Sequence, residues 1–362
     1  MKSFAHLLGA GILVVLINAS SALAQTEDES LQVLEELIVT ATRRSTDLQT
    51  TASAATVLTG DMMEKKAVFD LVQLQFASPS ISIGDYGSAN TFNMRGIGRS
   101  QVDIEIPAGI QLYRDKVPMF AGYFQNEPYF DMAGVEVLRG PQGTLAGKSA
   151  AGGAVFFRTR DARLDEFEAF AEGGIANYDS WSATAMVNIP VNDTLALRFA
   201  GSHLTQDDYW FNTITGEYTG DPDTRDLNAA RMSLTWEPSA NLTVKGKLEY
   251  NHLDFGGNAT TDYGDDPLHP TPCCGVDFEY VDRAHRAILD IAYDFDNGLV
   301  LTSVTGYQFA DTVNNRSNNS GIGPYDMIRW QMLKSASSAR VISPCIHRNS
   351  TCCHQRVSVT VG

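Results

Sequence analysis

The sequence predicts an α+β domain followed by an incomplete antiparallel transmembrane β-barrel. Three observations support this: the N-terminus resembles an export signal, the chain after residue 160 alternates apolar and polar residues with period two, and the connections between alternating segments are short and long in turn. No later run reaches the ~18 apolar residues of a spanning helix. Any membrane crossing is therefore expected to be made by strands.

Residues 1–24 are predicted to be a secretory signal peptide. Lys2 gives a basic start, residues 7–17 form an apolar run, and Ala22-Leu23-Ala24 has the small-x-small pattern of a cleavage site. The apolar run is shorter than the ~17 residues that a membrane anchor requires. We expect cleavage after Ala24 and, with a strand-built membrane domain, location in the outer membrane of a Gram-negative cell.

Composition and motifs exclude several other classes. A net charge of -16 and a pI near 4.8 argue against nucleic acid as a partner. Gly147-Lys148-Ser149 would need a glycine at position 142 to form a phosphate loop, and that position is Gln142, so no nucleotide is expected. No nucleophile lies beside a fixed base in a catalytic motif. We expect neither an enzyme nor a cofactor.

The first domain, residues 51–160, is predicted to mix helices and strands. Thr59 is a suitable N-cap for a helix over 62–66, and apolar residues in 68–75 have helical spacing. One strand is predicted to begin with Ile81 and Ile83, and another over 135–138. Residues 109–118 are predicted to form a hairpin that turns at Arg114-Asp115. A glycine-containing turn is expected at 139–143.

Residues 161–326 are predicted to form the first strands of the barrel. The predicted strands start near residues 167, 181, 194, 227, 241, 285 and 299. The series starts with a short loop at 177–180; short turns at 190–194, 237–241 and 296–298 then alternate with long loops at 206–226 and 254–283, as in outer-membrane barrels. Barrels with a plugged lumen have about 22 strands. The sequence therefore predicts about 7 of an expected 22 strands.

Residues 327–362 differ in composition from the rest. All 43 acidic residues precede them, whereas three of the five cysteines fall within them. Cys345, His347, Cys352, Cys353 and His354 do not match a regular zinc-ligand spacing. We interpret this segment as an aberrant or frame-changed tail. The disulfide state of Cys273 and Cys274 is left open.

Two segments resemble one family, the TonB-dependent outer-membrane receptors. They are residues 135–159, which begin Val-Glu-Val-Leu-Arg-Gly-Pro-Gln-Gly, and residues 34–41, Leu-Glu-Glu-Leu-Ile-Val-Thr-Ala. The resemblance implies that residues 51–160 are a plug domain that blocks a barrel. It also implies that residues 25–50 are a periplasmic segment whose β-branched stretch is the TonB box: Glu36, Leu37, Ile38, Val39, Thr40 and Ala41.

The same resemblance suggests site residues in the plug. Arg95 and Arg139 look like plug arginines that pair with barrel carboxylates in relatives; alternatively, each only orders its local turn. The structural glycines expected with them are Gly96, Gly140, Gly143, Gly147, Gly152 and Gly153. Aromatic residues of the loops are candidates for ligand binding: Tyr86, Tyr209, Trp210 and Tyr263.

The resemblance implies energy-coupled import of a scarce ligand across the outer membrane, with a ferric siderophore favoured. The expected partners are the TonB energy-transducing protein, outer-membrane lipid and a small-molecule ligand. Vitamin B12, a carbohydrate or another metal chelate are alternative ligands. A different reading is a truncated, transport-inactive fragment that at most binds TonB through its box.

Overall fold

The computed structural model describes residues 38–39, 46–47, 54–85, 90–98, 109–119, 126–142, 150–207, 211–212, 217–218, 225–255, 279–315 and 328–342. All of them lie in one compact unit, Leu37–Gly362. None of the helices in these ranges has the length and apolar character needed to cross a bilayer.

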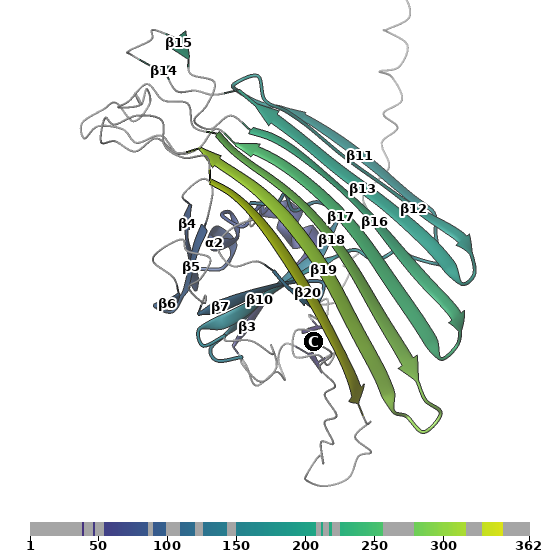
Figure 1. Ribbon diagram of the computed structural model, residues 1–362. Coiled ribbons are helices and arrows are strands. Elements are labelled where there is room, and N and C mark those ends of the chain that lie inside the picture. The colour runs from purple at the N-terminus through teal and green to yellow at the C-terminus, as the bar shows by residue number, and fades with distance from the viewer. Residues whose placement is uncertain are drawn as a thin grey trace, which may run out of the picture. The chain divides into compact units, whose positions relative to one another are not determined.

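A five-stranded mixed sheet forms the centre of the N-terminal domain (Figure 1). Its strands are β3 (Ala55–Thr59), β9 (Met132–Arg139), β10 (Gly153–Thr159), β7 (Ile110–Arg114) and β8 (Val117–Pro118), in that spatial order. The pair β10–β7 is parallel, and the other pairs are antiparallel. The predicted strand over 135–138 is the fully buried centre of β9.

Two short helices pack on this sheet. Helix α1 (Gly60–Lys65) begins two residues before the predicted 62–66, because its N-cap is Thr59, whose hydroxyl accepts a hydrogen bond from the Met62 amide. Helix α2 covers only Leu74–Ala77. The expectation of helix through 68–75 is therefore wrong for residues 68–73, which form turns. The helical spacing reflected burial instead, since Val68, Leu71 and Leu74 all lie in the core.

Two tight turns shape the rest of the domain. The first joins β5 (Asn90–Met94) to β6 (Ile97–Gly98) through Arg95 and Gly96, whose φ angles are 52° and 78°. Strand β4 (Ile81–Asp85) pairs with β5. The second joins β7 to β8 through Asp115 and Lys116, with φ angles of 44° and 72°. This turn lies one residue beyond the predicted Arg114-Asp115 because both central residues must adopt positive φ in such a hairpin.

The second part is an eight-stranded antiparallel sheet in the order β11-β12-β13-β16-β17-β18-β19-β20 (Figure 1). The strands are β11 (Glu168–Ile175), β12 (Trp181–Asn192), β13 (Leu195–Gln206), β16 (Arg225–Ser239), β17 (Leu242–Phe255), β18 (Glu279–Asp294), β19 (Val300–Asn315) and β20 (Ile328–Ile342). The first seven match the seven predicted strands. The eighth lies in the segment interpreted as an aberrant tail, and it pairs with β19 along its length.

Two two-residue ladders complete the described strands. Strand β1 (Ile38–Val39) pairs with β2 (Thr46–Asp47), and β14 (Phe211–Asn212) pairs with β15 (Glu217–Tyr218). The latter ladder lies within the predicted long loop 206–226.

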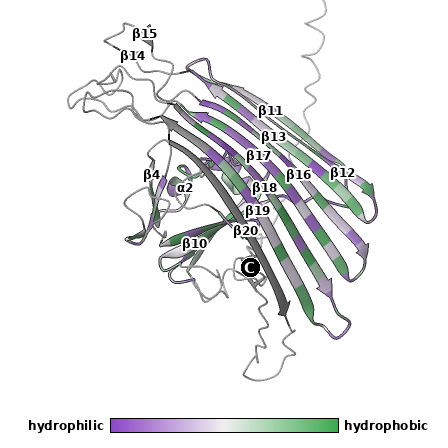
Figure 2. Cartoon of the chain, in the orientation of Figure 1, coloured by the Kyte–Doolittle hydropathy of each residue, from purple (hydrophilic) through white to green (hydrophobic). Residues whose placement is uncertain are grey.

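The two faces of the large sheet differ, and Figure 2 shows polar and apolar residues alternating along its strands. On β17, Leu248 and Tyr250 are exposed, whereas Glu249 between them is buried. On β18, exposed His285 and Tyr293 lie about 26 Å apart along the strand, or about 20 Å across the membrane at a tilt near 40°. This separation is comparable with the apolar band of about 25 Å in outer-membrane barrels.

Candidate functional site

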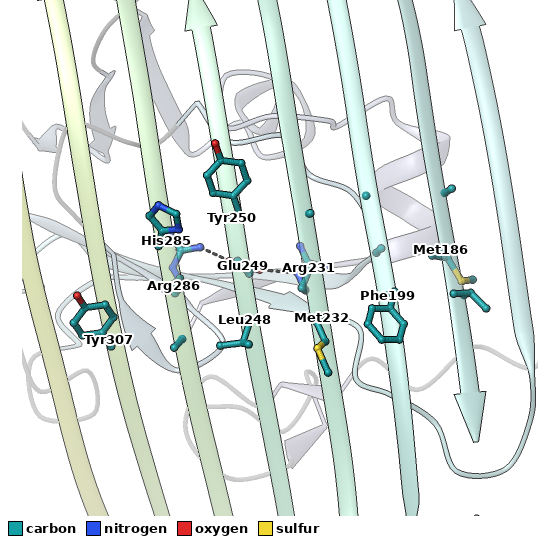
Figure 3. Close-up of a pocket in the computed structure, with 16 residues that line it drawn as sticks. Met186, Phe199, Arg231, Met232, Leu248, Glu249, Tyr250, His285, Arg286 and Tyr307 are labelled. Atoms are coloured by element: carbon teal, nitrogen blue, oxygen red, sulfur yellow. Dashed lines mark hydrogen bonds and ion pairs between the residues drawn. The ribbon is translucent and has the colours of Figure 1, made fainter. Parts of the chain in front are cut away.

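A buried cluster of charges joins the N-terminal domain to the large sheet. Its centre is Glu249 of β17, which is the register neighbour of Arg231 on β16 and of Arg286 on β18. Arg231 Nε donates to Glu249 Oε1 at 2.6 Å, and Arg286 pairs with the other oxygen (Figure 3). From the N-terminal domain, Arg114 Nη2 reaches Glu249 Oε1 at 3.3 Å. One carboxylate therefore holds three guanidinium groups, two from strands of the large sheet and one from the N-terminal domain.

Glu127 of the N-terminal domain completes this cluster. Arg286 Nη2 donates to Glu127 Oε1 at 2.8 Å, and Arg114 lies 3.9 Å from the same carboxylate. Burial opposes ionisation of Arg114, but Glu249 and Glu127 outweigh it and raise its pKa above the usual value. Arg114 is therefore a permanent cation within this cluster.

Asp131 forms a second contact with the sheet. Its carboxylate accepts two hydrogen bonds from Arg198 of β13, at 2.6 and 2.9 Å, and Arg198 also donates to Glu168 of β11 at 2.9 Å. Next to it, Arg231 donates to the Asp131 carbonyl at 3.1 Å and lies 4.6 Å from the Phe130 ring centroid. The segment 127–131 is thus held by arginines from three different strands.

Lys247 of β17 forms the third contact. Its ammonium group lies 2.8 Å from Asp161 and 3.1 Å from Asp115, and it donates to the Thr159 hydroxyl at 2.7 Å. Lys245 also pairs with Asp161, at 2.7 Å. Burial alone would raise the pKa of Asp161, but Lys247 and Lys245 hold it below its usual value. Asp161 therefore remains ionised well below neutral pH.

The β7–β8 hairpin touches the sheet closely at β19. A Cβ atom at Gly306 would lie 2.5 Å from Val117 Cγ1, so only glycine permits this approach. Beside it, Gln308 donates to the Pro118 carbonyl at 2.7 Å, and Lys116 pairs with Asp290 of β18.

These contacts are mainly polar, whereas the apolar core of the N-terminal domain is largely its own. The main cluster of that core contains residues 58–157 and none from the large sheet. The two arginine clusters together contain four cations (Arg114, Arg198, Arg231 and Arg286) and four anions (Glu127, Asp131, Glu168 and Glu249), so their charges balance. A smaller apolar contact also crosses the interface, where Phe130 packs against Ala200 and Ala229.

The opposite face of the same strands is apolar. A depression of about 780 Å³ lies there, lined in part by Phe199, Met232, Leu248, Tyr250 and Tyr307 (Figure 3). Leu248 and Tyr250 flank Glu249 in the chain and therefore point away from the ionic cluster.

The arginines singled out from the sequence do not make these contacts. Arg139 donates to the carbonyl of Ala55 at 3.0 Å and to the Thr56 hydroxyl at 2.9 Å, both on β3. These contacts are the local ordering that the sequence offered as the alternative, and Arg139 has no ion pair with a barrel carboxylate among the described residues. Arg95 is exposed in its turn and has no ion pair with any described residue.

The remaining predicted residues fall into two groups. Gly96 and Gly140 have positive φ angles, of 78° and 90°, and Gly152 and Gly153 lie at the start of β10. Of the predicted box, only the backbone of Ile38 and Val39 is described, as β1. The following lie outside the described residues: Glu36, Leu37, Thr40, Ala41, Tyr86, Gly143, Gly147, Tyr209, Trp210, Tyr263, Cys273, Cys274, the predicted signal peptide and the cysteines of the tail.

The sequence reasoning missed the charges in the middle of the strands. Arg198, Arg231 and Glu249 each lie between two apolar or aromatic residues of an alternating strand, and Arg286 lies between His285 and Ala287. A signal for them was present, because buried charges need partners. Four charges at inward positions of neighbouring strands indicate a partner domain inside the sheet.

Comparison with known proteins agrees with this architecture. Residues 47–154 match the family model described as TonB-dependent Receptor Plug Domain. The chain is 30% identical over 191 residues to the pesticin receptor of Yersinia pestis, covering 52% of this chain and 27% of that protein. It is 24% identical over 202 residues to the iron-regulated outer membrane virulence protein of Vibrio cholerae, covering 53% of this chain and 30% of that protein.

Among solved structures, the ferric yersiniabactin uptake receptor of Yersinia pestis has a similar fold. The TM-score is 0.69 at 21% sequence identity, and the match covers 81% of this chain and 46% of that one. The Ferric-Catecholate import receptor of E. coli K12 gives a TM-score of 0.60 at 15% identity, covering 83% and 46%. The chain thus spans less than half the length of each of these relatives.

The fold and the interface define an outer-membrane receptor in which a plug domain docks on the inner face of a strand sheet. Residues 47–154 match the plug domain of the TonB-dependent receptors, and the chain has the fold of part of such a receptor. Its N-terminal domain is their plug, and its large sheet is part of their barrel.

Proposed function

We propose that this receptor imports a ferric siderophore across the outer membrane and draws the energy from TonB. The support for the ligand comes from relatives, whose names refer to ferric yersiniabactin, ferric catecholates and iron regulation. The support for energy coupling comes from the plug and its contacts.

The observation that carries this proposal is the polar docking of the plug. Its apolar core is largely internal, and charged side chains such as Arg114, Glu127 and Asp131 attach it to the sheet. Water can replace these contacts, whereas it cannot replace an apolar seal without a large cost in free energy. A plug attached in this way can be displaced by a pull and can dock again.

We assign the point of that pull to Glu36–Ala41, the proposed TonB box. The backbone of Ile38 and Val39 already adopts a strand conformation and pairs with Thr46–Asp47. A short β-branched strand can add to the edge of a partner sheet through main-chain hydrogen bonds. Exchange of the internal partner strand for one from TonB would connect the force to the plug.

Iron-limited growth tests this proposal. A strain without other siderophore receptors, which expresses this receptor from its native gene, is supplied with ferric yersiniabactin, a ferric catecholate or vitamin B12. We expect an iron chelate to support growth only when TonB is present. The ligand class would be refuted if none of the iron chelates supported growth while vitamin B12 was taken up in a TonB-dependent way.

A further inference from the structure

A second cavity lies between the plug and one side of the sheet. Its volume is about 770 Å³, within the range of small-molecule sites. The plug contributes Met63, Phe69 and Asp70, and the sheet contributes Phe170, Thr184 and Ser202. Its surface thus combines aromatic rings, hydroxyl groups and charges.

The cavity extends toward the end of the sheet that carries the long connections. On β13 the lining includes Arg198 near mid-strand and continues to Leu204, close to the strand end at Gln206. On β16 it includes Arg225, the residue that follows the long loop. A ligand that enters from the side of the long loops therefore reaches this cavity before it reaches the ion pairs of the plug.

The innermost part of the cavity is bounded by Asp131, Arg198 and Glu168. Arg198 is 1% exposed and lies between the plug carboxylate of Asp131 and the wall carboxylate of Glu168. Asp131 adopts a φ of 49°, which a residue with a side chain rarely does. Arg198 is therefore a buried cation with one carboxylate partner on the plug and one on the sheet.

The attachment of the plug is uneven around the sheet. Among the described residues, Glu249, Arg286 and Lys247 of β17 and β18 hold it through the ionic contacts above. The inward hydroxyls of β12 and β13 bond instead to each other, with Thr184 and Ser202 oxygens 3.1 Å apart. Separation of the plug from the β11–β13 side breaks fewer ionic contacts than separation from β17–β18.

We propose that this cavity is a transit site for an anionic metal chelate, and that Arg198 passes from Asp131 to the chelate as the plug moves. The proposal rests on the import function above. A buried guanidinium that loses one carboxylate needs another anion. Carboxylate or catecholate oxygens of a ferric chelate supply it, while the aromatic rings contact its apolar parts.

Filling the cavity tests this proposal. Thr184→Trp places a large side chain in it, whereas Thr184→Val removes only the hydroxyl. Ala185→Trp adds the same ring to the opposite face of the same strand. Binding of a radiolabelled ferric catecholate is measured on de-energised cells, uptake is measured on energised cells, and heat-modifiable gel mobility reports folding.

We expect Thr184→Trp to retain binding and folding and to lose uptake, while Thr184→Val and Ala185→Trp behave like wild type. If the wild type imports the chelate and Thr184→Trp imports it equally well, the transit site is overturned and the import function remains intact. Absence of uptake by wild type with ferric catecholate and ferric yersiniabactin would overturn both. If Thr184→Trp fails to fold, a second measurement asks whether bound chelate protects a Ser202→Cys thiol from reaction with a maleimide. Absence of protection would overturn the site.

Discussion

Replacement of Glu249 by Gln should weaken the docking of the plug more than any other single charge change in the sheet. Glu249 is buried and neutralises Arg114, Arg231 and Arg286 together, so Gln leaves an uncompensated positive charge among them. Loss of one partner from a buried ion pair costs about 3–5 kcal/mol. At about 1.4 kcal/mol per tenfold, the docking equilibrium should shift by at least a hundredfold.

The matched control is Glu168→Gln. Glu168 pairs with the same kind of residue, Arg198, but its side chain is 31% exposed and Arg198 keeps Asp131. A pair of this kind contributes about 0–1 kcal/mol. The assay is maleimide labelling of an Ala229→Cys thiol, at a position buried against Phe130 of the plug, in the receptor in detergent micelles; the labelling rate is converted to the free energy of plug opening.

Glu249→Gln should lower that free energy by about 3 kcal/mol, and Glu168→Gln by less than about 1 kcal/mol. The double variant Glu249→Gln/Arg231→Gln restores the charge balance and should recover part of the loss. Equal protection of the Ala229→Cys thiol with and without Glu249→Gln would refute the conclusion that this cluster holds the plug.

Three further outcomes follow from the structure. Ile38→Pro removes a main-chain donor and should abolish binding of the TonB periplasmic domain in a pull-down, whereas Ile38→Val should bind normally; binding by the Pro variant would contradict the box. The pKa of Asp161 in the folded protein lies below the unfolded value of about 3.9, so its stabilising contribution is complete above that value and disappears as the pH falls through the folded pKa. The melting temperature of Asp161→Asn should therefore fall less steeply in acid than that of the wild type. An unchanged pH profile would contradict this. Residues 47–160 expressed alone should be soluble, monomeric and cooperatively folded, because their main core is internal; amide resonances without dispersion would disagree.

The strand architecture was predictable because its cause is local. In the seven predicted strands of the large sheet, alternation and turn chemistry appear in consecutive residues. The observed starts lie within two residues of the predicted ones except for β18, which begins six residues earlier. Strand β20 was missed because the composition of residues 327–362 led to their interpretation as an aberrant tail, although Ile328, Trp330 and Met332 alternate with polar residues. Its pairing with β19 depends on the neighbouring strand, which no local pattern reports.

The plug and its contacts were less predictable because they depend on distant residues. Arg114 and Glu249 are 135 positions apart in the sequence, and only the fold brings them together. Residues 68–73 were predicted as helix because buried apolar residues in consecutive turns imitate helical spacing. The resemblance suggested a barrel carboxylate as the partner of Arg139, with local ordering as the alternative. Its position at the end of β9 places it beside β3.

A reversible tether between plug and sheet tests most directly whether the plug must move for import. An ideal Cβ at Gly306 lies 3.1 Å from Val117 Cβ, slightly closer than the ~3.5–4.5 Å of a disulfide. The double variant Val117→Cys/Gly306→Cys should form this bond with a small shift of the β7–β8 hairpin. The controls are Val117→Cys, the pair Val117→Ala/Gly306→Cys and the wild-type chain with its five cysteines; Gly306→Cys alone would clash with Val117 Cγ1. We expect the oxidised double variant to bind the ferric chelate without importing it and to regain uptake on reduction; equal uptake with the tether closed would contradict the account.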